Sequence, residues 1–441
     1  MKRRIAFISE HASPLAVLGG VDSGGQNVYV AEICKSLVQL GYVIDIFTRK
    51  DSTALPEIFD WLPDIRVVHI DAGPAKEVPK EALLGYMSEF TDSMIRFIDQ
   101  YQLNYDLIHA NFFMSGLVAS GIKKQLGIPY VITFHALGKI RMIHQKEKDS
   151  FPAERLDIEQ MLVRDADYII AECPQDKQDL IEHYDADPSR ISIIPCGFSS
   201  EEFYPCSKQK ARQELGLKKD EVILLQLGRV VPRKGIDNVI HSMRFLKNIP
   251  KIKLLVVGGS DEKPDFAKDE ELRRLKEIAE SEGVSNMVEF VGRRNRQQLK
   301  YYYQAADFFI STPWYEPFGI TPLEAMACGT PVVGSDVGGI KYTVLHGKTG
   351  FLVPPHNPRA LADALLEGMS CPKKYQDLRQ NALKRVNENF TWKNVAKRTH
   401  RLYARVASHA YPEPMYLLHI RKLNGKAYKS YVVNSTAHVL S

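Results

Sequence analysis

The sequence alternates short, continuously apolar runs with longer amphipathic stretches, and this alternation occurs twice along its 441 residues. In the first half the expected strands are Ile5–Ser9, Val43–Thr48, Ile65–Ile70, Leu107–Ala110, Tyr130–Phe134, Tyr168–Ala171 and Ile191–Ile194. After residue 215 they are Val222–Gly228, Ile252–Val257, Val288–Val291, Asp307–Ser311 and Pro331–Gly334. Apolar strands separated by helices are typical of parallel sheets covered on both faces. The sequence therefore predicts an α/β protein with two domains.

The stretch at residues 196–215 separates the two repeats, because it has no periodic apolar pattern. We expect one domain over residues 1–196, a second over 197–391 and a helix over 392–408. The tail at 409–441 is open to two interpretations, a hairpin around Asn424-Gly425 or a frayed end. Open parallel sheets bind ligands at the carboxyl ends of their strands. Two such sheets facing each other would place a small-molecule site between the domains.

Composition and charge argue against several classes of protein. No stretch reaches 18 apolar residues, and the apolar run after the basic start is too short for a signal peptide, so we expect a cytoplasmic protein. The six cysteines include no Cys-x-x-Cys pair, which argues against a disulfide framework or a zinc site. The net charge of +5 suits anionic ligands or weak contact with an anionic membrane, and it is too small to indicate a nucleic-acid partner.

Two motifs in the first half follow expected strands. Asp22-Ser-Gly-Gly-Gln-Asn-Val28 would open a helix, and its paired glycines let backbone N–H groups approach an anion, although such turns also occur without a ligand. It is not Gly-x-Gly-x-x-Gly, which argues against a nicotinamide-dependent oxidoreductase. His109 and His135 stand near strand ends. Each could either contact a ligand or form a structural hydrogen bond.

The second half carries the more informative motifs. Arg229 and Lys234 follow a strong strand, where they could grip a diphosphate or form a solvated basic loop. Glu316 and Glu324 lie eight positions apart, separated by a turn and a helix start near Thr321-Pro322. That arrangement suits one carboxylate beside a sugar, helix amides beside a phosphate and a second carboxylate beside a ribose diol.

Three further motifs resemble phosphate-binding or metal-binding sites only in part. Gly347-Lys-Thr349 lacks the first glycine of a P-loop, because Tyr342 stands there. Asp165-Ala-Asp167 precedes its strand, and Asp185-Ala-Asp187 runs into a proline turn. We expect no metal site at either pair.

Together these residues resemble the family-4 retaining glycosyltransferases, which have the GT-B architecture of two facing Rossmann-like domains. The most specific element is Glu-x7-Glu, here Glu316 and Glu324. The Gly24-Gly25 loop and Phe-His135-Ala-Leu-Gly-Lys look most like the branch of sucrose synthases, sucrose-phosphate synthases and inositol-phosphate glycosyltransferases. The resemblance covers roughly residues 4–408. It implies that the last helix crosses back onto the first domain.

The resemblance also implies roles. Catalytic roles at the donor sugar are implied for His135 and Glu316. Donor contacts are implied for Arg229, Lys234, Phe318, Gly319, Ile320, Glu324, Gly24 and Gly25, the two glycines facing either the phosphates or the acceptor. Acceptor contacts are implied for Asp22, Asn27, Lys76 and Arg155.

The implied reaction is metal-independent, retaining transfer of a hexosyl group, without a cofactor. The donor is a nucleotide diphosphate sugar, with UDP favoured, and the acceptor is a sugar or a sugar phosphate. The inositol-phosphate subgroup grips its acceptor phosphate with a Tyr and a Thr, and here those positions are Phe112 and Ala136. The oligomeric state is open. The alternatives are a GT-B epimerase or hydrolase acting on the nucleotide sugar, and a non-catalytic nucleotide-sugar sensor.

Overall fold

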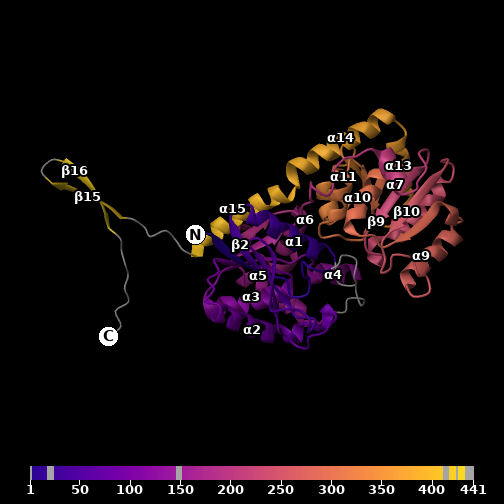
Figure 1. Cartoon of the computed structure of the whole chain (residues 1–441). Helices are drawn as coiled ribbons and strands as arrows, with labels where there is room; N and C mark the ends of the chain where they lie inside the picture. Colours follow the sequence, from indigo (N-terminus) through magenta and orange to yellow (C-terminus); the bar gives the residue numbers. More distant parts are fainter. Residues whose placement is uncertain (1, 17–23, 146–150, 411–416, 424–425, 433–441) are drawn as a thin grey trace.

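The computed structural model describes residues 2–16, 24–145, 151–410, 417–423 and 426–432. The described residues up to 410 form two lobes, indigo to magenta and pink to orange in Figure 1, each built around one sheet. The strand orders are β3-β4-β2-β1-β5-β6-β7-β8 and β11-β10-β9-β12-β13-β14. The predicted pair of facing Rossmann-like domains is confirmed.

The first sheet consists of β1 (Arg3–Ile8), β2 (Tyr42–Arg49), β3 (Ile58–Leu62), β4 (Ile65–Ile70), β5 (Leu107–Asn111), β6 (Tyr130–Thr133), β7 (Tyr168–Ala171) and β8 (Ile191–Ile193). The second consists of β9 (Val222–Leu227), β10 (Ile252–Val257), β11 (Val288–Gly292), β12 (Phe308–Ser311), β13 (Val332–Ser335) and β14 (Gly350–Val353). Two of these strands were not predicted, β3 and β14. β3 is an edge strand that pairs antiparallel with β4, so the first sheet is not wholly parallel.

The helices of the first lobe are α1 (Gly25–Val38), α2 (Met87–Gln100), α3 (Phe113–Leu126), α4 (Gly138–Gln145), α5 (Glu154–Asp165) and α6 (Pro174–Tyr184). Those that follow are α7 (Lys208–Glu214), α8 (Ile236–Met243), α9 (Glu270–Ser281), α10 (Arg296–Ala305), α11 (Ile320–Ala327), α12 (Gly338–Thr343), α13 (Pro358–Met369), α14 (Pro372–Asn389) and α15 (Trp392–Ala410). In the described ranges, no helix is long and apolar enough to cross a membrane. β15 (Leu417–Leu423) and β16 (Lys426–Val432) pair antiparallel, and the expected turn between them lies outside the described residues.

Both faces of the central strands are buried, as the continuous apolar runs predict. In β1, Ile5 and Phe7 belong to one core cluster, whereas Ala6 and Ile8 belong to another on the opposite face. Successive side chains of a strand point to opposite faces, so an apolar residue at every position requires helices on both sides.

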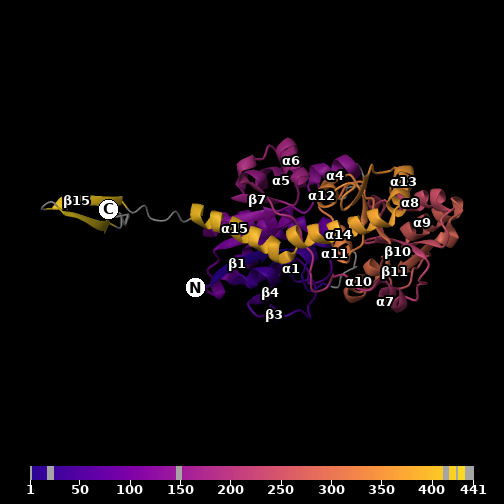
Figure 2. The ribbon, with the colours of Figure 1, turned by 90° about the horizontal axis from the view of Figure 1, so that it is seen from above.

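The crossover helix joins the two lobes. α14 lies along the second lobe and α15 continues over the first (Figure 2), where it packs on α1. Tyr403 on α15 is hydrogen-bonded to His109 Nδ1 at 2.6 Å, so His109 serves as a buried structural anchor in the middle of β5. The outgoing linker passes close by, because a Cβ on Gly197 would lie 2.8 Å from the Trp392 ring. The two segments that connect the lobes, one at Gly197 and one at Trp392, therefore pack against each other.

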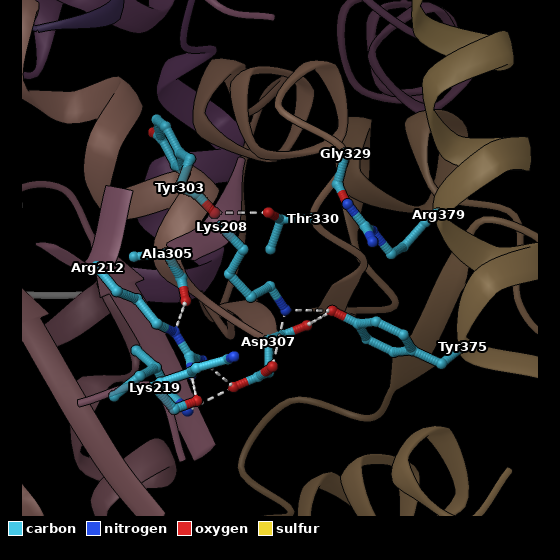
Figure 3. A network of polar contacts seen from close by, with 11 residues as sticks. Lys208, Arg212, Lys219, Tyr303, Ala305, Asp307, Gly329, Thr330, Tyr375 and Arg379 are labelled. Atoms are coloured by element: carbon cyan, nitrogen blue, oxygen red, sulfur yellow. Dashed lines mark hydrogen bonds and ion pairs between the residues drawn. The ribbon is translucent and has the colours of Figure 1, made fainter. Parts of the chain in front are cut away.

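A polar network surrounds Asp307 at the amino-terminal end of β12 (Figure 3). Asp307 precedes β12 and accepts hydrogen bonds from Lys208 and Arg212 on α7, each at 2.8 Å. Tyr375 on α14 donates to the Asp307 carbonyl at 3.0 Å. The network thus links α7, the start of β12 and α14 through the carboxylate and the backbone carbonyl of Asp307.

Candidate active site

The basic loop after β9 packs directly on the loop after β12. Gly228 and Gly235 both have positive φ, +148° and +63°. A Cβ on Gly235 would lie 2.0 Å from the carbonyl oxygen of Thr312, so only glycine permits this approach. The contact brings Lys234, the last residue of a short 3-10 turn, beside Glu316.

Three cations surround Glu316. Lys234 Nζ donates to Glu316 Oε2, and Arg233 Nη1 lies 3.6 Å from the same oxygen. Burial disfavours the ionised Glu316, but Lys234, Arg233 and Arg229 outweigh that effect and hold the pKa of Glu316 below its usual range. Burial lowers the pKa of Lys234 to about 8. In the described structure, Arg233 Nη1 is buried and makes no hydrogen bond, so it could donate one to a bound anion.

Glycines also set the shape of the Glu316 loop. A Cβ on Gly338 would lie 1.9 Å from the Glu316 carbonyl, and one on Gly339 would lie 2.3 Å from Phe318. Gly319, with φ of +90°, immediately precedes α11, which begins at Ile320. The first turn of α11 therefore presents backbone N–H groups next to the loop, where the helix dipole favours negative charge.

Glu324 has partners of its own inside the second domain. It is 3% exposed and accepts hydrogen bonds from Tyr303 Oη at 2.8 Å and from Arg296 Nη1 at 3.3 Å. Burial raises the pKa of Glu324, and the Arg296 charge partly offsets the effect. Arg296 also pairs with Glu202 at 2.6 Å. The two predicted glutamates thus share one loop and helix but stand in separate polar networks.

The glycine loop of the first domain faces these groups. A Cβ built on Gly24 would lie 4.0 Å from Arg229 Nε, and one on Gly25 would lie 3.9 Å from the Ile320 side chain. Asn27 is buried, and its side-chain amide accepts from Gly24 N and donates to the Ser13 carbonyl, each at 2.9 Å. Asn27 therefore shapes the loop. Asp22 lies outside the described residues.

His135 stands at the carboxyl end of β6 in a strained conformation, with φ of +58°. Its Nδ1 lies 3.1 Å from Glu172 Oε1, and its Nε2 lies 3.1 Å from Asn111 Oδ1. The Tyr29 ring packs against it edge-on, with centroids 4.9 Å apart. The imidazole is thereby held in one orientation by β5, β7 and α1.

The structure separates the two basic residues expected at the acceptor. Arg155 is 2% exposed, is paired with Glu159 at 2.7 Å and donates to the Ala136 carbonyl. Three aromatic rings surround its guanidinium, those of Phe112, Phe113 and Phe151. Lys76 is exposed on a different loop, where its carbonyl accepts from Arg49 at 2.5 Å. Arg155 thus adjoins His135 through Ala136, whereas in the described structure Lys76 makes no hydrogen bond or ion pair with that group.

Direct contacts bridge the domains at the donor loop. The His144 ring stacks on Tyr315 with centroids 4.9 Å apart and an interplanar angle of 14°, and Gln145 donates to the Tyr315 hydroxyl. Cys173 Sγ lies 3.5 Å from the Pro317 carbonyl. The ends of α4 and α6 therefore touch the segment that carries Glu316.

Sequence reasoning missed several residues of this region, notably Arg233, Asn111, Glu172 and Arg296. Asn111 and Glu172 stand at or just after the carboxyl ends of β5 and β7, the signal that selected His135, so the same rule applied to polar residues would have found them. Arg296 lies on α10 with no local motif, and only the tertiary structure brings it to Glu324.

Comparison with known proteins agrees with this geometry. Residues 23–202 match the family described as Glycosyltransferase Family 4, and residues 207–385 match Glycosyl transferases group 1. D-inositol 3-phosphate glycosyltransferase 2 of Catenulispora acidiphila is 34% identical over 412 residues, covering 92% of this chain and 95% of the relative. The chain belongs to glycosyltransferase family 4.

Solved structures place this family-4 glycosyltransferase among GT-B proteins. Sucrose-phosphate synthase from Thermosynechococcus elongatus is 34% identical, with a TM-score of 0.84, and the match covers 92% of this chain and all of that one (100%). Anabaena HepE, solved with UDP and glucose, is 21% identical with a TM-score of 0.70, over 91% of this chain and 99% of that one, and supports the fold alone. The predicted family and GT-B fold are both confirmed.

Proposed function

We propose that this enzyme moves a hexosyl group from a UDP-sugar to a hydroxyl of a sugar or sugar-phosphate acceptor, with retention of configuration. The observation that carries the proposal is the cluster of Arg229, Arg233 and Lys234 around Glu316, opposite Gly24 across the domain boundary. A cation cluster in which Arg233 Nη1 is buried without a hydrogen bond suits a diphosphate. The names of the similar proteins, which include a sucrose-phosphate synthase and inositol-phosphate glycosyltransferases, support this class of acceptor.

The charges suggest how the reaction proceeds. When the sugar–phosphate bond breaks, negative charge grows on the diphosphate, and Lys234, the neighbouring arginines and the α11 amides would stabilise it. If the acceptor hydroxyl approaches on the face that the diphosphate leaves, the departing phosphate can take its proton. The cations would replace a metal, so we propose that transfer continues in EDTA. His135 and Glu316 would hold the donor sugar.

Whether the acceptor carries a phosphate depends on the pocket near Arg155. Its charge is already balanced by Glu159, and aromatic rings surround it. Phe112 and Ala136 cannot supply side-chain hydroxyl donors. We therefore include unphosphorylated sugars among the acceptors to be tested.

The first experiment is a thermal-shift screen against UDP, GDP, ADP and their glucose conjugates, since a specific ligand raises the unfolding temperature by mass action. Acceptor sugars and sugar phosphates are then added with the preferred donor, and the product is analysed by NMR. We expect a glycoside with the anomeric configuration of the donor. Free sugar or an epimer without any glycoside would instead establish a hydrolase or epimerase, and binding without turnover would indicate a sensor.

Two variants test the assigned site. Glu316→Gln and His135→Ala should each lower turnover by about 100-fold or more, the scale expected for loss of a positioned polar group at a reacting centre. The unfolding temperature of each variant is measured in parallel, so that a loss of turnover in a folded protein is distinguished from a loss of folding. Near-normal turnover in either variant would remove that residue from the mechanism.

A further inference from the structure

The carboxylate of Glu172 is buried against His135 and has no role in the reaction as described above. Glu172 directly follows β7 and its side chain is 3% exposed. Its Oε1 lies 3.1 Å from His135 Nδ1 and 2.9 Å from Cys196 Sγ. A carboxylate held against one nitrogen of a histidine commonly determines which nitrogen carries the hydrogen.

The other ring nitrogen faces an amide whose orientation is fixed. Asn111 Nδ2 donates to the carbonyls of Ile8 and His109 at 3.2 and 3.3 Å. The oxygen of that amide, Oδ1, therefore points at His135 Nε2. Because an amide oxygen only accepts hydrogen bonds, Nε2 must carry a hydrogen.

The Glu172 side of the ring is consistent with this assignment. Burial raises the pKa of Cys196 well above its usual value, so its thiol keeps its hydrogen and donates to Glu172 Oε1. Wherever the hydrogen between Nδ1 and Oε1 lies, Nε2 keeps its own. The ring thus has Nε2–H as its donor.

We propose that Glu172 is a positioning residue that holds His135 in the Nε2–H form and in the orientation needed to donate to an oxygen of the transferred sugar. This inference rests on the proposed function, because it assigns His135 to that sugar. Without Glu172, the imidazole would have neither of its two side-chain partners once a ligand displaces the Asn111 contact, and it could turn.

The test compares Glu172→Ala, which removes the hydrogen bond, with Glu172→Gln, which can still bond Nδ1. Asp176→Asn is the matched control, since Asp176 accepts from the Glu172 backbone N–H at 2.8 Å in the same corner. We expect Glu172→Ala to lower kcat at least tenfold with UDP affinity unchanged within twofold. Glu172→Gln should recover most of that loss, and Asp176→Asn should keep kcat within twofold of the parent enzyme.

A second readout does not depend on turnover. Nitrogen-15 histidine NMR with the preferred nucleotide sugar bound and no acceptor added, assigned by the signal missing in His135→Gln, should show a single Nε2–H form in the parent enzyme and a tautomer mixture in Glu172→Ala. Unchanged tautomers in Glu172→Ala, or equal losses in Glu172→Ala and Asp176→Asn, would overturn the proposal. If the enzyme does not catalyse the proposed transfer, the parent enzyme and all variants lack turnover. The NMR comparison then still reports whether Glu172 controls the His135 tautomer.

Discussion

The charge of Lys234 should make donor binding depend on pH. In the ligand-free enzyme burial lowers the pKa of Lys234 to about 8, despite its contact with Glu316. A bound diphosphate adds negative charge beside the ammonium and should raise that pKa again. UDP binding should therefore favour the charged lysine and take up a proton near pH 8.

The magnitude follows from the titration. With a pKa of about 8, about nine tenths of the lysine is charged at pH 7 and about one tenth at pH 9. If only the charged form binds UDP tightly, Kd should rise about tenfold between these values, equivalent to about 1.4 kcal/mol. At pH 8 each UDP bound should take up about half a proton. The phosphates of UDP contribute little above about pH 7, where they are already ionised.

Isothermal titration calorimetry measures both quantities, with Kd from pH 6.5 to 9.5 and proton uptake from two buffers of different ionisation enthalpy. Lys234→Arg is the control, because a guanidinium stays charged throughout this range. Its Kd should be independent of pH, whatever its absolute affinity. A parent enzyme whose Kd stays constant within twofold up to pH 9.5, or an arginine variant with the same pH dependence, would refute the reasoning.

Two further predictions concern stability. Burial and the Glu172 charge raise the pKa of Asp176 to about 8, so the folded state binds the extra proton between about pH 4 and 8 and loses stability as pH rises through that window. Asp176→Asn should remove a slope of at most about 1.4 kcal/mol per pH unit from the urea-unfolding free energy, and an unchanged slope would contradict this. Asp307→Ala should cost about 3–5 kcal/mol in the same assay, because it leaves the buried Arg212 charge unpaired, whereas a loss below about 1 kcal/mol would show that the network in Figure 3 contributes little.

Much of the fold could be read from the apolar pattern, but two strands could not. β3 carries Asp60 and lies at a sheet edge with exposed positions, so it lacks the continuous apolar run that marks a buried strand. β14 begins with Gly350 directly after a turn and is followed by Pro354, so only three apolar residues mark it. Local pattern predicts a strand only where burial on both faces demands apolar residues at every position.

The sequence by itself determined the two-domain α/β architecture and the chemistry of the donor side. Repeated apolar runs require covered sheets, and the spacing of Glu316 and Glu324 places both on one loop and helix. Only the tertiary structure decided which groups meet. It paired Lys234 with Glu316, held Glu324 between Tyr303 and Arg296, balanced Arg155 with Glu159 and set Glu172 against His135. The reason is physical, because hydrogen bonds and pKa shifts depend on distances and burial, which separate strands and domains create only when they pack together.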